Sequence, residues 1–236
     1  MAVYLRDLSA RAPTAADLPA VKELFAICAR VEGELEGHEE DGDLSAGWQR
    51  TDFQLSSDAW LILTRQGLVV GYGAVWPVNG DEAETAHKGM GAFCVRVHPA
   101  YRGRGIGTLL LRLVEQRARS ALENVDDRAR GGAFLTTTVA YGNRSARALL
   151  EREGYQLERS FWHIVIESQA QAAWSERVSL TLKLELEEEG DAASASKSPA
   201  RLLAPAGRTM VRHYCCYEKP LVPGALCLEK REAGEA

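Results

Sequence analysis

The segment that most constrains the fold of this chain is a glycine-rich turn, Arg102-Gly-Arg-Gly-Ile-Gly107, between a strand pattern and a helix pattern. Residues 91–98 form a mostly apolar run that Pro99 ends, and residues 105–122 carry apolar side chains at helical spacing. A helix that begins at such a turn presents backbone N–H groups without intrahelical acceptors, and its dipole favours an anion there. Glycines also let the anion approach the backbone. We therefore predict a pyrophosphate site formed by Gly103, Arg104, Gly105, Ile106, Gly107 and Thr108.

Three known phosphate-binding patterns can be compared with this turn. A Walker loop needs a lysine after its last glycine, whereas Thr108 follows Gly107 here. A Rossmann fingerprint needs G-x-G-x-x-G, whereas these glycines occupy positions 103, 105 and 107. The third pattern, R/Q-x-x-G-x-G/A, is satisfied from Arg102 to Gly107. In this pattern, and in the preceding Val95-Arg-Val-His-Pro-Ala-Tyr101, the sequence resembles the GCN5-related N-acetyltransferases, the GNAT superfamily.

A second segment, Asn143-Arg-Ser-Ala-Arg-Ala-Leu-Leu-Glu-Arg-Glu-Gly-Tyr155, is similar to the other hallmark of that superfamily. There an asparagine opens a helix that ends in glycine and an aromatic residue. The resemblance extends over most of residues 1–168, with a strand and helix, a hairpin, the motif strand and helix, and then strand, helix and strand. It implies an α/β fold with a mixed sheet whose fourth and fifth strands splay apart.

The resemblance also implies a reaction and the residues that serve it. Acetyl-CoA, or another acyl-CoA, would donate its acyl group directly to an amine without an acyl-enzyme, and no metal is expected. Val95, Arg96 and Val97 would offer backbone groups to the pantetheine arm. Arg102 would lie beside the pyrophosphate, and Asn143 would contact the cofactor near the fifth strand.

The sequence departs from the superfamily where catalytic residues are usual. Leu150 stands where many members have a proton-donating tyrosine, and Thr138 stands where some have a glutamate base. Tyr141, two residues before Asn143, is our candidate for the missing proton donor. Two functions therefore stay open: an acyl-CoA-dependent N-acyltransferase, which we favour, and a catalytically silent acyl-CoA-binding regulatory module.

The domain organisation is predicted from the patterns after residue 168. We expect one GNAT-like domain over residues 1–220 with an inserted hairpin and loop at about 169–208, because residues 178–186 alternate as a strand and residues 187–205 are acidic and then Ala/Ser-rich. A truncated second acetyltransferase-like half is the alternative. Too few residues remain for a full second copy, and residues 221–236 are expected to be a tail.

The composition limits the classes of binding partner and the cellular compartment that we expect for this protein. A net charge of -5 argues against a nucleic-acid binder, and no apolar run reaches the ~18 residues of a membrane span. No secretory signal is visible, and the five cysteines include no C-x-x-C pair, so we expect reduced thiols and a cytoplasmic protein. The acceptor is expected to be a small-molecule amine or a peptide, and a homodimer is possible.

The stretch from Glu32 to Asp43 holds seven carboxylates. It fits either a solvated loop or frayed helix end, or an acidic rim at the acceptor entrance, and the rim would favour a cationic acceptor.

Overall fold

The structure is a computed structural model of the chain, and it describes residues 7–32, 44–77, 91–122, 133–168, 179–185 and 207–221. It divides into two compact units, one formed by residues 1–137 with 218–236 and the other by residues 138–217. Strands β5 (Phe134–Ala140) and β8 (Gly207–Pro220) each have residues in both units. The two units are described one after the other.

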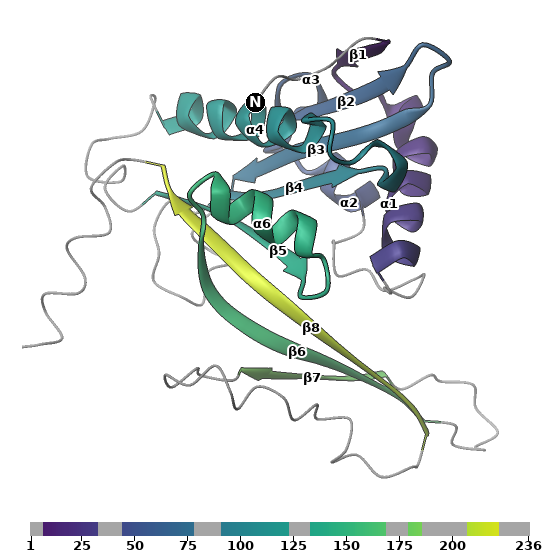
Figure 1. Ribbon diagram of the computed structural model, residues 1–236, viewed down its shortest axis with the longest axis vertical. Helices are drawn as coiled ribbons and strands as arrows, with labels where there is room; N and C mark the ends of the chain where they lie inside the picture. Colours follow the sequence, from purple (N-terminus) through teal and green to yellow (C-terminus); the bar gives the residue numbers. More distant parts are fainter. Residues whose placement is uncertain are drawn as a thin grey trace, which may run out of the picture. The chain divides into compact units, whose positions relative to one another are not determined.

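The first unit is a sheet with helices on both of its faces (Figure 1). Its strands pair in the order β1-β2-β3-β4-β5, and every pair is antiparallel except β4 with β5. In chain order its elements before β5 are β1 (Leu8–Arg11), η1 (Ala15–Asp17), α1 (Leu18–Glu32), α2 (Leu44–Gln49), α3 (Leu55–Asp58), β2 (Ala59–Thr64), β3 (Val69–Pro77), β4 (Gly91–Val97), η3 (Pro99–Tyr101) and α4 (Ile106–Leu122).

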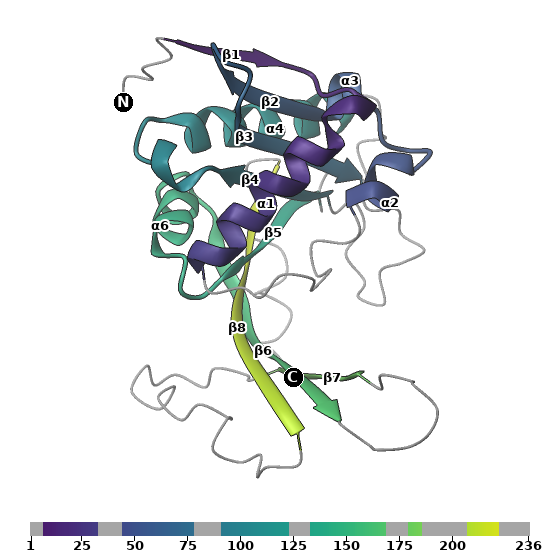
Figure 2. The same cartoon turned by 90° about the vertical axis from the view of Figure 1, so that its right-hand side faces the viewer.

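Helices α1 and α4 cover opposite faces of this sheet, as Figure 2 shows. Successive strand residues point to opposite faces, so Leu61 packs in the cluster that holds α1 and Ile62 in the cluster that holds α4. The central strands are therefore apolar on both faces, as buried strands are. Gly71 lets α4 lie close, because a Cβ there would stand 2.9 Å from a side-chain carbon of Ile106. This packing fixes the start of α4 against β3.

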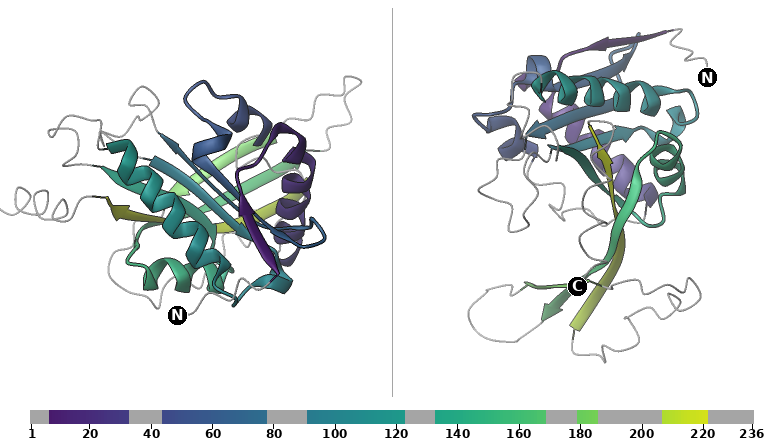
Figure 3. Two further views of the ribbon diagram at one scale, coloured as in Figure 1. Left: turned by 90° about the horizontal axis from the view of Figure 1, so that it is seen from above. Right: turned by 90° about the vertical axis from the view of Figure 1, so that its left-hand side faces the viewer.

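The second unit holds the end of β5, then α6 (Arg144–Arg152), β6 (Gln156–Ser168), β7 (Ser179–Glu185) and most of β8. Its strands follow the order β5-β8-β6-β7. Strands β6 and β7 pair antiparallel from Phe161 opposite Glu185 to Glu167 opposite Ser179. Figure 3 shows β6 and β8 as long neighbouring strands.

The α/β fold with a mixed sheet is confirmed, and two expected elements differ in detail. The alternating strand formers of residues 2–10 predict an opening strand there, whereas β1 occupies Leu8–Arg11 and residues 1–6 lie outside the described residues. The sequence predicts one short helix over residues 45–54, whereas the structure has two short helices, α2 and α3, at Leu44–Gln49 and Leu55–Asp58. The second begins anew because the Asp58 carboxylate accepts the Gln54 backbone N–H at 2.7 Å.

The predicted strand over residues 178–186 is confirmed as β7. The loop at 187–205 and the tail after residue 221 lie outside the described residues, and the single-domain organisation stays a prediction. No helix in the described part of the chain is both long enough and apolar enough to cross a bilayer.

Candidate functional site

The parallel ladder between β4 and β5 covers only the first residues of β4. Strand β4 pairs with β3 over all seven of its residues, but with β5 it is in register only at Gly91 with Leu135 and Ala92 with Thr136. Where this parallel ladder ends, the Thr137 hydroxyl donates to the Phe93 carbonyl at 2.9 Å. The second half of β4 therefore has no ladder with β5 in the described residues, as the predicted splay requires.

The register of β4 decides which backbone groups face this open edge. The His98 N–H donates to the Val70 carbonyl at 3.0 Å, so Val97 and Gly71 form a non-hydrogen-bonded pair. Antiparallel pairs alternate. The N–H and C=O of Val95 and Val97 therefore point to the open edge, whereas those of Arg96 face β3. Of the three residues proposed for the pantetheine arm, Val95 and Val97 have the required orientation.

The glycine turn follows directly and needs left-handed backbone at two positions. Gly103 has φ +76° and Gly105 has φ +86°, a region that disfavours side chains. The Leu109 N–H makes the first α-helical bond, to the Gly105 carbonyl at 3.0 Å. The amides of Ile106 and Gly107 precede that bond, and Gly105 has no side chain to accept them. The start of α4 thus has the donors that an anion requires.

The two arginines of the turn are held by the protein itself. Arg102 places Nη2 2.6 Å from Oε1 of Glu32, and its Nε donates to the Val97 carbonyl at 3.2 Å. The guanidinium of Arg104 lies 4.8 Å from the centre of the Tyr101 ring. Arg102 is therefore an anchor between the end of α1 and the end of β4.

Glu32 is a residue of this site that the sequence interpretation missed. We expected it in a solvated loop, a frayed helix end or an acidic rim, whereas it is the last residue of α1 and its side chain is only 5% exposed and pairs with Arg102. Helical spacing could have found it, because Glu32 follows Cys28 by four residues on the face that buries Val21 and Leu24. The rest of the acidic stretch, 33–43, lies outside the described residues.

The cysteines in the described part of the chain are buried. The Cys28 thiol donates to the Val97 carbonyl at 3.4 Å, and burial, with a contribution from the Glu32 charge, raises its pKa. Burial also raises the pKa of Cys216 to about 11. The thiols of all four described cysteines are reduced and buried, in agreement with the prediction, and Cys227 lies outside the described residues.

In the second unit, α6 begins with a side-chain cap. Asn143 Oδ1 accepts the Ala146 N–H at 3.0 Å, and Gly154, with φ +88°, ends the helix. Leu150 is 4% exposed and Tyr155 3% exposed, so both pack in the core. The Asn-to-Gly helix predicted here is confirmed, and the position usual for a proton donor holds a buried aliphatic side chain.

Tyr141 belongs to a stack of four planar groups in the same unit. Its ring lies 4.2 Å from that of His213, which lies 4.3 Å from that of Trp162, and the Arg147 guanidinium lies 4.4 Å from the centre of the Tyr141 ring. Arg147 Nη1 also donates to the Tyr141 carbonyl at 3.2 Å. The Tyr141 side chain is thus held from both sides while 47% of the residue stays exposed.

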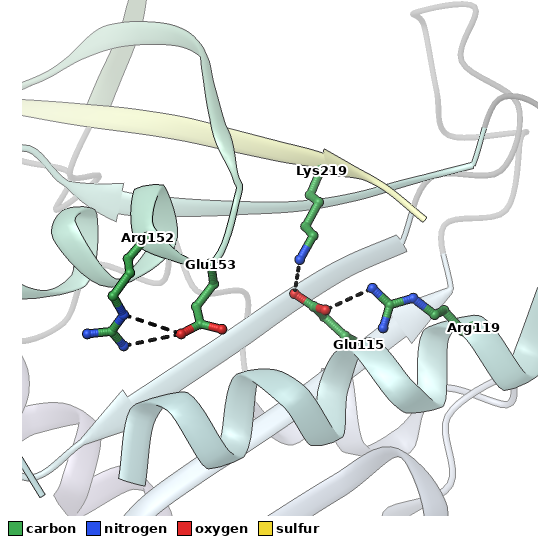
Figure 4. A network of polar contacts seen from close by, with 5 residues as sticks. All are labelled: Glu115, Arg119, Arg152, Glu153 and Lys219. Atoms are coloured by element: carbon green, nitrogen blue, oxygen red, sulfur yellow. Dashed lines mark hydrogen bonds and ion pairs between the residues drawn. The ribbon is translucent and has the colours of Figure 1, made fainter. Parts of the chain in front are cut away.

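Arg112, Arg117 and Arg119 in the sequence predict a solvated helix face near an anionic cofactor, but in α4 two of these arginines form ion pairs with carboxylates. Arg117 Nε lies 2.6 Å from the buried Asp58 carboxylate. Glu115, also buried, accepts Arg119 at 2.9 Å and Lys219 at 2.8 Å (Figure 4). These cations neutralise carboxylates that would be costly to bury alone.

Comparisons with known proteins agree with this fold. The sequence profile described as Acetyltransferase (GNAT) family matches residues 18–155. The structure is similar to a GCN5-related N-acetyltransferase from Sphaerobacter thermophilus, with 18% identity and a TM-score of 0.67, covering 92% of this chain and 97% of that chain. It is also similar to a phosphinothricin acetyltransferase from Sinorhizobium meliloti solved with AcCoA, with 16% identity, a TM-score of 0.52, and 91% and 89% coverage.

An N-acetyltransferase from Staphylococcus aureus Mu50 is similar at 13% identity, with a TM-score of 0.51 and coverage of 92% of this chain and all of that chain (100%). Comparison with curated protein sequences gave no significant match. At these identities the solved structures establish the fold. The profile match covers more than half of the sequence and includes both the glycine turn and α6. The chain belongs to the acetyltransferase (GNAT) family.

Proposed function

We propose that this chain is an acyl-CoA-dependent N-acyltransferase that transfers the acetyl group of acetyl-CoA directly to a primary amine. The observation that carries the proposal is the open edge of β4, which leads through two left-handed glycines into the start of α4. A strand edge and a helix N-terminus in sequence suit a ligand with an amide-bearing arm and a pyrophosphate.

The residues present fit that ligand. The N–H and C=O of Val95 and the N–H of Val97 point to the open edge, where they would pair with amides of the pantetheine arm, while the Val97 carbonyl already accepts Arg102 Nε. Ile106 and Gly107 have amides without α-helical acceptors for the pyrophosphate, and a Cβ added at Gly103 would meet nothing within 4 Å. When bound, acetyl-CoA would supply the acetyl group as a thioester. The similar Sinorhizobium protein was solved with AcCoA, which supports this choice.

For proton transfer we propose the Tyr141 hydroxyl as donor to the departing thiolate. Leu150 has no proton to give, whereas Tyr141 is half-exposed and held by its stack. A free thiol has a pKa of about 8.5, so release as thiolate at pH 7 costs roughly 2 kcal/mol, which a general acid would offset. The role of Tyr141 stays a prediction, as does that of Asn143. The class of acceptor and the formation of a homodimer also stay predictions.

The test uses the full chain in two steps. Titration calorimetry with acetyl-CoA measures binding, and release of free thiol in the presence of a panel of amines and peptides measures transfer. Binding with turnover supports the proposal. Binding without turnover of any acceptor supports the alternative, a silent acyl-CoA-binding module, and absence of binding overturns both.

A further inference from the structure

We propose that Glu32 is a positioning residue of the acyl-CoA site, which it serves by holding Arg102 on the Val97 carbonyl. The inference rests on the proposed function of the β4 edge and the glycine turn. Glu32 belongs to neither of the two sequence motifs, because it stands 70 residues before Arg102. Glu32 contacts Arg102 directly, and we infer that it acts on the site through that arginine.

The contact is short, shielded and directed. Glu32 Oε1 lies 2.6 Å from Arg102 Nη2, with 5% of the Glu32 side chain and 27% of the Arg102 side chain exposed. A shielded, charge-assisted pair of this length is stronger than an exposed one. Because Arg102 also donates Nε to the Val97 carbonyl at 3.2 Å, the carboxylate fixes the guanidinium in the position that makes this second bond.

The hydrogen bond from Arg102 Nε occupies the Val97 carbonyl at one end of the open edge of β4. At the other end the Thr137 hydroxyl donates to the Phe93 carbonyl. The backbone N–H and C=O groups of Phe93, Val95 and Val97 all point to the open edge, because in an antiparallel strand every second residue directs these groups away from its partner strand. The Phe93 and Val97 carbonyls thus accept hydrogen bonds from protein donors, and the Val95 carbonyl lies between them on the same edge. We infer that this arrangement sets one register for an extended ligand on the edge.

The pair also restrains the glycine turn. Arg102 is the last residue before Gly103, so its anchored side chain limits where the left-handed turn and the first turn of α4 lie. Without Glu32 the guanidinium would lose its fixed orientation, and Val97 would lose a directed donor. Preformed sites bind more tightly because less order must be imposed on binding.

A second ion pair of the same unit is a matched control. Asp58 and Arg117 are also 2.6 Å apart, with 6% and 37% of their side chains exposed. Arg117 stands eleven residues into α4, which places it about 16 Å along the helix from the glycine turn. Asp58→Asn and Glu32→Gln therefore each neutralise a buried carboxylate that pairs with an arginine, and only Glu32 adjoins the site. Asp58 also accepts the Gln54 N–H, so Asp58→Asn is expected to lower the unfolding temperature at least as much as Glu32→Gln does.

The experiment compares the two variants in calorimetry with acetyl-CoA and in thermal unfolding. We expect both variants to unfold at a lower temperature, and only Glu32→Gln to raise the Kd for acetyl-CoA, by about tenfold, which corresponds to about 1.4 kcal/mol. In turnover, its KM for acetyl-CoA should rise while kcat and the KM for the acceptor stay within about twofold.

Arg102→Lys gives a second, independent test. Lysine keeps the charge but lacks the fork that reaches Glu32 and Val97 together. We expect a similar rise in Kd, and no further rise when it is combined with Glu32→Gln, because both changes break one unit. An unchanged Kd in Glu32→Gln would overturn the inference. So would a lower Kd, which would mean that Glu32 withholds Arg102 from the pyrophosphate. Failure of wild type to bind acetyl-CoA would instead overturn the proposed function.

Discussion

Two helices of this chain begin just after a strand of the splayed pair, and they begin in opposite ways. Helix α4 follows β4 through Gly105, which has no side chain, so the first amides of the helix meet no side-chain cap from that residue. Helix α6 follows β5 through Asn143, whose Oδ1 accepts the Ala146 amide. The start of α4 thus has backbone amides that a ligand could bind, whereas the start of α6 has an amide that already donates to a side chain of the same helix.

The difference teaches where an anion can bind. Amides that a side chain already caps are unavailable to a phosphate, so the start of α6 is a poor anion site although an Asn opens it in the sequence motif. If Asn143 contacts the cofactor, it does so while its Oδ1 caps the helix. The start of α4 is the one of the two that suits a pyrophosphate.

Converting α4 into a capped helix should have the largest effect. Asp introduced at Gly105 would cap the first amides itself and add a negative charge beside the phosphates. We expect Gly105→Asp to lower the affinity for acetyl-CoA by at least ~100-fold, about 2.8 kcal/mol, in calorimetry. Gly107→Asp, inside the first turn, should do the same through charge alone.

Backbone strain must be separated from this effect. Gly67→Asp introduces the same residue at φ +82°, close to the +86° of Gly105, in the turn between β2 and β3. It should destabilise the protein similarly and leave affinity unchanged. Gly105→Asn would cap without charge and should give an intermediate loss. Retained affinity in folded Gly105→Asp would show that acetyl-CoA binds elsewhere.

The next effect tests the start of α6, where Tyr141 is the proposed proton donor. Tyr141→Phe keeps the ring that stacks between His213 and Arg147 and removes only the hydroxyl. We expect kcat to fall at least tenfold, as loss of a general acid does, with acetyl-CoA affinity preserved. Single-turnover measurements ensure that chemistry limits the rate. An unchanged kcat would leave water or the substrate as the donor.

The parts of this site that could be predicted are those that depend on interactions between residues close in the sequence. The turn, the helix after it and the Asn-capped α6 were predictable, because glycines and caps act within a few residues. Strand β2 was predicted with its observed bounds, Ala59–Thr64, because its apolar run ends at a turn.

Interactions between distant segments were not predictable. Period-two alternation says that Val95 and Val97 face the same way, but the partner strand decides whether they face it or the open edge. Glu32 looked like part of a solvated acidic run because its partner, Arg102, is distant in sequence. Asp58 and Arg117, 59 residues apart, were missed for the same reason.

A smaller effect concerns the cap of α6 itself. Asn143→Ala should lower the free energy of unfolding by about 1 kcal/mol, measured in urea, whereas Asn143→Ser should restore most of it, because serine also caps. If Asn143 additionally holds the cofactor, Asn143→Ser will regain stability without regaining acetyl-CoA affinity. Full recovery of both would limit Asn143 to capping.

The smallest effect comes from a third helix start, before α1, where Asp17 caps the turn that begins at Thr14. Its carboxylate accepts the Thr14 N–H at 2.7 Å and pairs with Arg11 at 2.6 Å, and the hydrogen bond from Arg11 is the main reason that the Asp17 pKa is far below its usual range. A depressed pKa in the folded state means that the unfolded chain binds this proton more readily. The stabilisation is therefore complete well above pH 4, the ordinary range of Asp, and is lost as the pH falls.

Asp17→Asn should cost roughly 0.5–1 kcal/mol at pH 7, because Arg11 is 44% exposed and solvent weakens the pair. Urea unfolding of both proteins at pH 7, 5 and 3 should show the difference shrinking toward the lowest pH. Asp7→Asn is the control, since the Asp7–Arg65 pair has the same 2.6 Å length but side chains that are 62% and 80% exposed. It should change stability little at any pH. A difference between wild type and Asp17→Asn that persisted undiminished at pH 3 would show that the Asp17 side chain stabilises this helix start by packing and not by charge.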